Sequence, residues 1–210
     1  MLKKAPKQAR SEQMVVHILA GATRVLNTMP LAQATTNRIA EVAGVSVGSL
    51  YQYFDSKQAI ATALLHKHLD DTVILLREAR MASRGERVES RLRTPVIEIL
   101  NDHCGQRMLH INLIRLAAAQ TPSGILQGYV DRMVEEIAQV LAEERPEADT
   151  DEVRLSAKLR HGTSTLLIHS AVIDPDAASA DVVLDHYDAL SAANLKVLGK
   201  ARAPRRRVDA

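Results

Sequence analysis

Tryptophan is absent from the 210 residues of this chain, aromatic residues make up only 2% of it, and Cys104 is its single cysteine. One cysteine cannot form an internal disulfide, which argues against the disulfide-stabilised secreted class. Residues 1–30 lack the apolar run and the small-residue cleavage site of a signal peptide. No apolar stretch approaches the roughly 18 residues that a membrane span requires. The sequence therefore predicts a cytoplasmic chain with no membrane partner.

Strand patterns are missing as well, because no run of alternating β-branched residues is bounded by turn residues. The apolar residues recur instead at the helix period, which predicts an all-α fold. Predicted helices span about residues 10–29, 35–43, 47–54, 57–80, 149–173 and 179–198, with more between 95 and 145. Residues 82–94 are rich in charge and lack an apolar run, so a loop is expected there, and Pro95 is expected to start the next helix.

Motifs of catalysis and cofactor binding do not occur in the sequence. Gly-x-Gly-x-x-Gly, P-loop and Gly-x-Ser-x-Gly patterns are all absent. We therefore predict that the chain is not an enzyme and uses no cofactor.

Eight histidines raise the question of a metal site, but neither Cys-x-x-Cys nor His-Glu-x-x-His accompanies them. His66 and His68 are two residues apart and point to different sides of a helix. His161 and His169 lie eight apart on another helix, and His110 lies near an apolar face. Such histidines are more often hydrogen-bonded core or pocket residues than ligands. The spacing predicts no metal site.

The net charge of +2 conceals an uneven distribution. Residues 1–57 hold seven Lys or Arg against three acidic residues, and residues 196–210 hold six against one, which leaves 58–195 at −7. A basic end on an acidic body is typical of a polyanion-binding segment attached to a domain with a different function. Three of the five aromatic residues also gather in one place: Tyr51, Tyr53 and Phe54.

That basic end contains the pattern of a helix-turn-helix. Two short predicted helices, 35–43 and 47–54, are joined by a turn with Gly44, and the second helix of such a motif enters the DNA major groove. Leu50 and Phe54 lie one turn apart and are expected to pack inward. The other faces of the second helix are then left for DNA.

The residue types on those faces suit DNA recognition. Ser49 and Gln52 are short enough to reach base edges, whereas tyrosine hydroxyls and the Lys57 ammonium group reach phosphate oxygens. Gly48 costs a helix about 1 kcal/mol relative to alanine, which favours a close approach of the backbone to the groove wall.

The run 34–57, ATTNRIAEVAGVSVGSLYQYFDSK, resembles the DNA-binding signature of the TetR family of bacterial transcriptional regulators. The resemblance covers about residues 10–65, and Asp55-Ser56 stands where the family more often has a proline-containing turn. It implies a homodimer with two three-helix heads on effector-binding bodies, usually a repressor that leaves a palindromic double-stranded DNA operator when a small molecule binds. The DNA contacts that it implies are Thr35, Thr36, Arg38, Ser46, Val47, Gly48, Ser49, Tyr51, Gln52, Tyr53 and Lys57.

The sequence divides into a DNA-binding domain at 1–56, an effector-binding and dimerisation domain at 57–200, and a basic tail at 201–210. The effector pocket is expected to be lined by Cys104, Met108, His110, Tyr129, Met133 and Leu167. Cys104 lies in an apolar stripe and is expected to be a buried, inert thiol. With few aromatic partners for stacking, the pocket favours an aliphatic or modestly polar molecule over a flat aromatic cation.

Small residues in the last two helices permit close approach in a four-helix dimer interface. They are Gly162, Ser164, Ser170 and Ala171 on one helix and Ala189, Ala192 and Ala193 on the other. The alternatives are an activator, or an architectural DNA-binding protein without a ligand. The architectural protein predicts a basic body, whereas residues 58–195 are acidic.

Overall fold

A computed structural model describes residues 9–119, 124–174, 176 and 179–198 of the chain, and this part contains nine α-helices and no strand. The all-α prediction is confirmed. The helices are α1 (Ala9–Leu26), α2 (Thr36–Ala43), α3 (Val47–Tyr51), α4 (Lys57–Ala82), α5 (Val88–Gly105), α6 (Arg107–Ala119), α7 (Gly124–Glu144), α8 (Thr150–Ile173) and α9 (Ala180–Leu198). The predicted tail at 201–210 lies outside the described residues.

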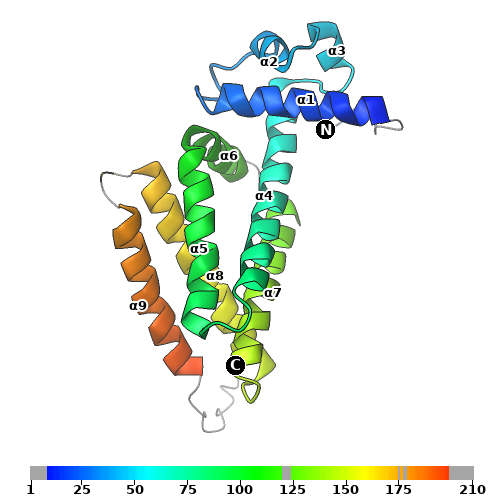
Figure 1. Ribbon diagram of the computed structural model, residues 1–210. Coiled ribbons are helices and arrows are strands. Elements are labelled where there is room, and N and C mark those ends of the chain that lie inside the picture. Colours follow the sequence, from blue (N-terminus) through cyan, green and yellow to red (C-terminus); the bar gives the residue numbers. More distant parts are fainter. Residues whose placement is uncertain (1–8, 120–123, 175, 177–178, 199–210) are drawn as a thin grey trace, which may run out of the picture.

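Two parts stand out in Figure 1: helices α1 to α3 gather at one end, and α4 leads from them into a bundle of the remaining helices. We call residues 9–56 the head and residues 57–198 the body. No helix of the described chain has both the length and the apolar character needed to cross a bilayer.

Side-chain caps explain where several helices begin. Thr35 accepts a hydrogen bond from the Arg38 amide, Ser46 from the Ser49 amide, and Asp149 from the amides at the start of α8. Each cap satisfies a backbone N–H that has no partner inside its helix. The predicted starts of these three helices are confirmed, while the first helix ends at Leu26 and the third at Tyr51, both three residues earlier than predicted.

The apolar core of the head continues into the body. Ile18, Ile39 and Phe54 are fully buried, and they belong to the same cluster as Ile60 of α4 and Leu113 of α6. The head therefore packs against the first turns of α4 and against α6. Two further apolar clusters fill the body between α4, α5, α7, α8 and α9.

The segment 82–94 is not the loop that its charge predicted. After a turn at Gly85, which has a φ of 89°, helix α5 begins at Val88. Pro95 consequently lies inside α5 and not at its start. Val88 and Leu92 lie four residues apart and are both buried in the body, so the packing of this face outweighs the charge and the proline.

The prediction of a buried Cys104 is wrong, because this thiol is exposed. Helix α5 ends at Gly105 and α6 starts at Arg107, so no single apolar stripe runs from Cys104 to Met108. The preceding residue, His103, occupies the buried face instead.

Candidate nucleic-acid interface and ligand cavity

The turn between α2 and α3 has the geometry of a helix-turn-helix. Gly44 adopts the left-handed conformation, with φ 69° and ψ 30°, and its amide donates to the carbonyls of Ala40 and Glu41. A side chain at this position would be strained, which explains the glycine. Leu50 is fully buried, so α3 is fixed with one face inward and the others outward.

A second glycine, Gly21 of α1, allows α2 to cross closely. A Cβ atom added at Gly21 would lie 2.6 Å from the Ala43 Cβ and 2.8 Å from the Ala43 backbone nitrogen and Cα. Such distances are shorter than van der Waals contact, so no larger side chain fits without a shift of the backbone. Gly21 thus sets the short distance at which α2, and α3 with it, packs against α1.

The outer face of α3 is open. Tyr51 is 44% exposed, Gln52 and Gly48 are exposed, and Ser49 is half-buried. A Cβ atom added at Gly48 would meet only the Ser46 hydroxyl, at 3.9 Å. Packing inside the chain therefore does not require a glycine at position 48.

Hydroxyl groups pair at the edges of this face. The Thr36 hydroxyl and the Tyr51 hydroxyl lie 3.0 Å apart, and the Ser46 and Ser49 hydroxyls 2.8 Å apart. These pairs hold four of the predicted DNA-contacting side chains in defined positions at the surface.

Tyr53 and Val47 are less free than the sequence suggested. Both are half-buried and pack against the core of the head, and the Tyr53 hydroxyl lies 3.3 Å from the Ser11 hydroxyl of α1. Each side chain therefore packs against the core with one part and is exposed to solvent with the other.

Two predicted cationic contacts already have partners within the chain. The Lys57 ammonium group donates to the carbonyl oxygens of Ala32 and Ala34, at 2.8 and 2.9 Å. The Arg38 guanidinium group pairs with the Glu41 carboxylate at 2.8 Å, at an exposed position. Lys57 therefore ties the loop before α2 to the start of α4.

Asn112 of α6 joins the head to the body. Its buried side-chain amide donates to the carbonyls of Leu26 and Met29, at 2.8 and 3.0 Å, and its oxygen accepts from the Leu31 amide at 2.9 Å. One side chain thus satisfies three backbone groups where the chain leaves α1.

A cavity of about 350 Å³ lies in the body beside this joint. Its walls are mostly apolar, with five histidines and one tyrosine among them, which suits a small ligand. The lining residues are Leu65, His68, Leu69, Thr72, His103, His110, Leu113, Ile114, Ala117, Ala118, Leu126, Tyr129, Val130, His161, Thr165 and His169.

Two of the six residues predicted for the pocket, His110 and Tyr129, line this cavity. Cys104 is exposed, Met133 lines a different cavity, and Met108 and Leu167 are not among the lining residues. Burial raises the pKa of Tyr129 to about 12, so its hydroxyl is a neutral donor in the cavity wall.

Three histidines from three helices meet at one end of the cavity. One ligating nitrogen from each of His68 of α4, His103 of α5 and His110 of α6 lies within 4.8 Å of the others. The His68 Nε2 and the His110 Nδ1 are 3.0 Å apart, and the rings of His103 and His110 stack at 3.7 Å. The sequence did not indicate this arrangement, because the three residues are far apart in it.

Burial keeps these imidazoles uncharged. It lowers the pKa of His103 to about 3 and that of His110 to about 2, and each is lowered further by the neighbouring histidines. Burial also lowers the pKa of His68, against the attraction of Asp102 and Asp71. At neutral pH the rings therefore carry lone pairs and no net charge.

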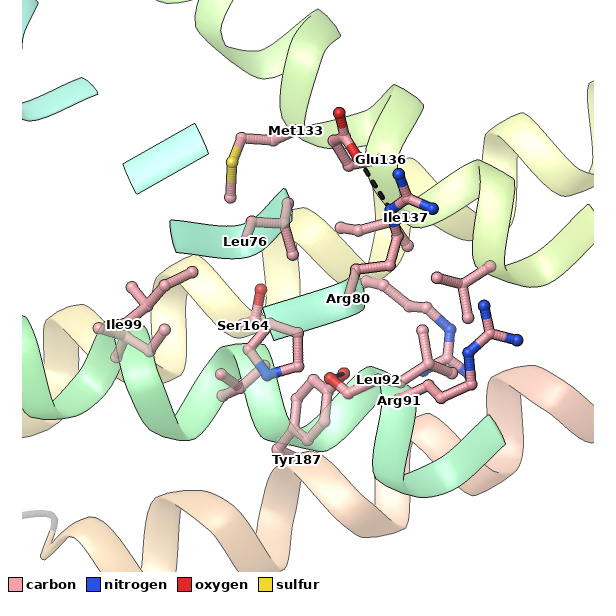
Figure 2. A pocket seen from close by; sticks show the side chains of 15 residues that line it. Leu76, Arg80, Arg91, Leu92, Ile99, Met133, Glu136, Ile137, Ser164 and Tyr187 are labelled. Atoms are coloured by element: carbon pink, nitrogen blue, oxygen red, sulfur yellow. Dashed lines mark hydrogen bonds and ion pairs between the residues drawn. The ribbon is translucent and has the colours of Figure 1, made fainter. Parts of the chain in front are cut away.

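A second, much smaller cavity has a buried ion pair in its wall (Figure 2). The Glu136 carboxylate of α7 accepts from Arg80 Nε at 2.9 Å and from Arg77 Nε at 2.7 Å. Nearby, the Tyr187 hydroxyl donates to the Leu92 carbonyl at 2.8 Å. At about 30 Å³ this space admits a water molecule or two and no organic ligand.

Sequence reasoning missed Gly21, His103, Asn112 and Glu136. A signal was present for Gly21, since a glycine inside a strongly periodic helix favours a close packing contact. The other three are polar residues among apolar ones on their helices, and only the assembled body shows what each of them contacts.

Comparison with known sequences finds relatives of the N-terminal part of the chain. Residues 18–64 match the family model described as bacterial regulatory proteins, tetR family. An uncharacterized HTH-type transcriptional regulator of Mycobacterium tuberculosis (strain CDC 1551 / Oshkosh) is 40% identical over 58 residues, which are 28% of this chain and 29% of that relative. The alignment thus spans less than a third of the relative's length.

Comparison with solved structures covers nearly the whole chain. A transcriptional regulator from Rhodococcus sp. Rha1 matches with a TM-score of 0.72 at 19% identity, over 90% of this chain and 99% of that one. The fatty acid degradation regulator FadR from Bacillus halodurans matches with a TM-score of 0.60 at 22% identity, over 93% and 96%. At these identities the likeness is one of fold.

Proposed function

We propose that the chain is a homodimeric transcriptional regulator of the TetR family, because residues 18–64 match the model of that family and the fold is similar to that of solved regulators. We propose further that it represses from a palindromic DNA operator and leaves it when a ligand occupies the body cavity, and that it acts in the cytoplasm. The observation that carries DNA binding is the open outer face of α3, whose inner face is fixed by the buried Leu50.

In this proposal the side chains of the head divide into two groups. Ser49 and Gln52 read base edges, with Val47 and Gly48 against the groove wall. The others contact phosphate oxygens and fix the register: Thr35, Thr36, Arg38, Ser46, Tyr51, Tyr53 and Lys57. The paired hydroxyls of Thr36 and Tyr51 support the second role, because they are held 3.0 Å apart before DNA arrives.

Exposed apolar side chains on α8 and α9 support dimerisation through these two helices. Leu155, Leu159 and Leu166 of α8 are 50 to 69% exposed, and Leu190 and Val197 of α9 are 50 and 53% exposed. Apolar side chains gathered on adjacent helices mark an interaction surface. Of the small residues predicted for this interface, Gly162, Ser170, Ala189, Ala192 and Ala193 are exposed, whereas Ala171 is buried in the chain's own core.

The position of the cavity supports ligand control. Helices α4 and α6 both line it, and both also hold the head, α4 through Lys57 and α6 through Asn112. A ligand that moves one helix relative to the other would swing the head without unfolding it. Because adjacent major grooves are about 34 Å apart, a change in head separation releases DNA.

Selection of duplexes from a random-sequence library by the purified chain tests DNA binding. We expect a palindromic consensus, bound by the dimer. Gln52→Ala should relax preference at one base pair per half-site by roughly 1–3 kcal/mol, and Tyr51→Phe should weaken binding to all sequences by about 1 kcal/mol. Gln139→Ala, at an exposed position of α7, serves as the control. Equal losses on consensus and scrambled DNA for Gln52→Ala would remove it from the base-reading group.

Spin labels on the two heads test the mechanism. We expect the distance between them to change when a ligand releases DNA, and a fixed distance would contradict the swing. The alternative, a ligand-independent architectural protein, predicts that no small molecule shifts the thermal stability of the chain.

A further inference from the structure

We propose that His68, His103 and His110 bind a divalent transition metal ion of the zinc class, and that this ion is the effector of the cavity. The proposal deepens the proposed function, on which it rests, by naming the ligand class of the same site. It goes against the sequence, whose spacing predicts no metal site.

The geometry of the three rings carries the proposal. Imidazole nitrogens bind Zn²⁺ at about 2.0–2.1 Å, so the nitrogens of a tetrahedral site lie about 3.3 Å apart. The His68 and His110 nitrogens are 3.0 Å apart, and all three lie within 4.8 Å of one another. Because a ring lone pair lies in the ring plane, the stacked rings of His103 and His110 must turn to aim one nitrogen each at a common ion.

Orphan nitrogens give a second, independent observation. Both ring nitrogens of His103 and the Nε2 of His110 are buried with no hydrogen-bond partner among the described residues. An unpaired buried polar group destabilises a fold, and a phenylalanine would fill the same space without that penalty. An ion at this site would give one nitrogen of His103 a partner, which a ring that served only for packing would not need.

The donor set selects the kind of ion. Imidazole suits zinc, copper and nickel, whereas calcium and magnesium prefer oxygen ligands. The carboxylates of Asp71 and Asp102 line a neighbouring cavity, which His68 and His103 also border. Lys67 pairs with Asp71 in that cavity, so the carboxylate of Asp102 is the charge that favours a cation beside these two imidazoles.

Three protein ligands leave one position of a tetrahedral ion open. That position faces the cavity of about 350 Å³, where His169 of α8 lies with its ring 5.1 Å from that of His110. A water molecule, the His169 imidazole or an oxygen of a small molecule completes the coordination there.

Binding of the ion would act on the head directly. His68 is on α4, and His110 is two residues from Asn112, the residue that holds the head. An ion bound by both histidines would fix the position of α6 against α4. The metal therefore biases the two helices that seat the head.

Titration of the full-length, chelator-treated chain with Zn²⁺ and with Co²⁺ tests the site without DNA. We expect one ion per chain, visible absorption of four-coordinate Co²⁺, and a rise in thermal stability with Zn²⁺. His103→Phe keeps the stacked ring and removes both orphan nitrogens. It should fold, weaken Zn²⁺ binding about 100-fold or more, and lose the Zn²⁺-dependent stabilisation.

His66→Ala, at an exposed histidine of the same helix α4, is the matched control and should bind Zn²⁺ like the unaltered chain. His110→Gln is the second variant should His103→Phe fail to fold. Equal Zn²⁺ binding by the unaltered chain and a folded cluster variant would overturn the site, as would an absence of binding.

DNA binding is measured separately on the selected duplex. We expect Zn²⁺ to lower DNA affinity at least tenfold for the unaltered chain and not for His103→Phe. Zn²⁺ binding with unchanged DNA affinity would overturn the ion as effector. In each of these cases, DNA binding by the metal-free chain would still support the proposed function, whose failure is therefore distinguishable.

Discussion

The head and the body use their polar residues in opposite ways. In the head, the hydroxyls of Thr36, Ser46 and Tyr51 and the ion pair of Arg38 lie at the surface around a wholly apolar core. In the body, polar and charged side chains are buried: His103 and His110 of the histidine cluster, Asn112, and Glu136 with Arg80. The head presents its polar groups at the surface, and the body encloses its polar groups in the interior.

This difference also decides what a single substitution does. Removal of a surface hydroxyl from the head leaves its partners hydrated, so binding changes more than folding. Removal of a buried polar group from the body leaves its partner without a hydrogen bond to water or protein. The free energy of unfolding therefore falls. The substitutions below test that contrast.

Glu136→Ala is expected to have the largest effect. Glu136 is 5% exposed and accepts from Arg80, so its loss leaves a buried guanidinium group without a counter-charge. Breaking such a pair costs about 3–5 kcal/mol of unfolding free energy. Urea denaturation followed by circular dichroism measures it.

Glu135→Ala, at the exposed neighbouring position of α7, is the control and should change stability by less than about 0.5 kcal/mol. Equal effects of the two substitutions would mean that the buried pair contributes no more than a surface carboxylate. Burial of polar groups in the body would then not make their removal more costly to folding than removal of surface groups.

Gly21→Ala tests the close crossing of α1 and α2 in the head. Its Cβ would lie 2.6–2.8 Å from Cβ and backbone atoms of Ala43, so α2 must move away from α1. Overpacking of this kind costs about 1–3 kcal/mol. Thermal denaturation measures the loss, and DNA affinity should fall with it because α3 follows α2.

Gly128→Ala on α7 is the matched control, because a Cβ at Gly128 meets nothing within 4 Å. It should leave stability unchanged or raise it by up to about 1 kcal/mol, since alanine is the better helix former. A Gly21→Ala chain as stable as this control would show that the crossing of α1 and α2 tolerates a methyl group.

The contrast between the two parts also explains what the sequence could predict. The caps at Thr35 and Ser46 and the turn at Gly44 depend on neighbours within a few residues, so local chemistry was sufficient to find them. The same holds for the inward face of Leu50 and Phe54, both fully buried as predicted.

The interior of the body depends on contacts between distant residues, and there sequence reasoning failed. His68 and His110 are 42 residues apart, and Arg80 and Glu136 are 56 apart. Spacing along one helix contains no information about such neighbours. Pro95 was misplaced for a related reason, because the packing of α5 against other helices outweighed its local preference.

Lys57→Met is expected to reduce stability and DNA binding together. The ammonium group donates to two carbonyls, at 2.8 and 2.9 Å, and its third N–H is left for a phosphate oxygen. We expect unfolding free energy to fall by about 1 kcal/mol. The slope of log K against log salt should fall by up to about 0.9 per head, for one lost phosphate contact.

Lys67→Met, whose parent side chain is exposed on α4 and pairs with Asp71, is the control for Lys57→Met. It should change neither quantity by more than a few tenths. A stability loss with an unchanged salt slope would assign Lys57 to the loop alone and remove it from the DNA contacts.

Gly48→Ala is expected to have the smallest effect on stability, and one of opposite sign. The position is exposed, and a Cβ there meets only the Ser46 hydroxyl at 3.9 Å, so the head has room for a methyl group. Alanine should stabilise α3 by up to about 1 kcal/mol. If the glycine allows close approach to DNA, the added methyl group meets the groove wall, and affinity should fall for every sequence while thermal stability rises.

Gly128→Ala, the control, should bring a similar gain in stability without the loss of affinity. A Gly48→Ala chain that gains stability and binds DNA unchanged would show that α3 lies farther from the groove wall than proposed. The base-reading role of Ser49 and Gln52 would then require longer or water-mediated contacts.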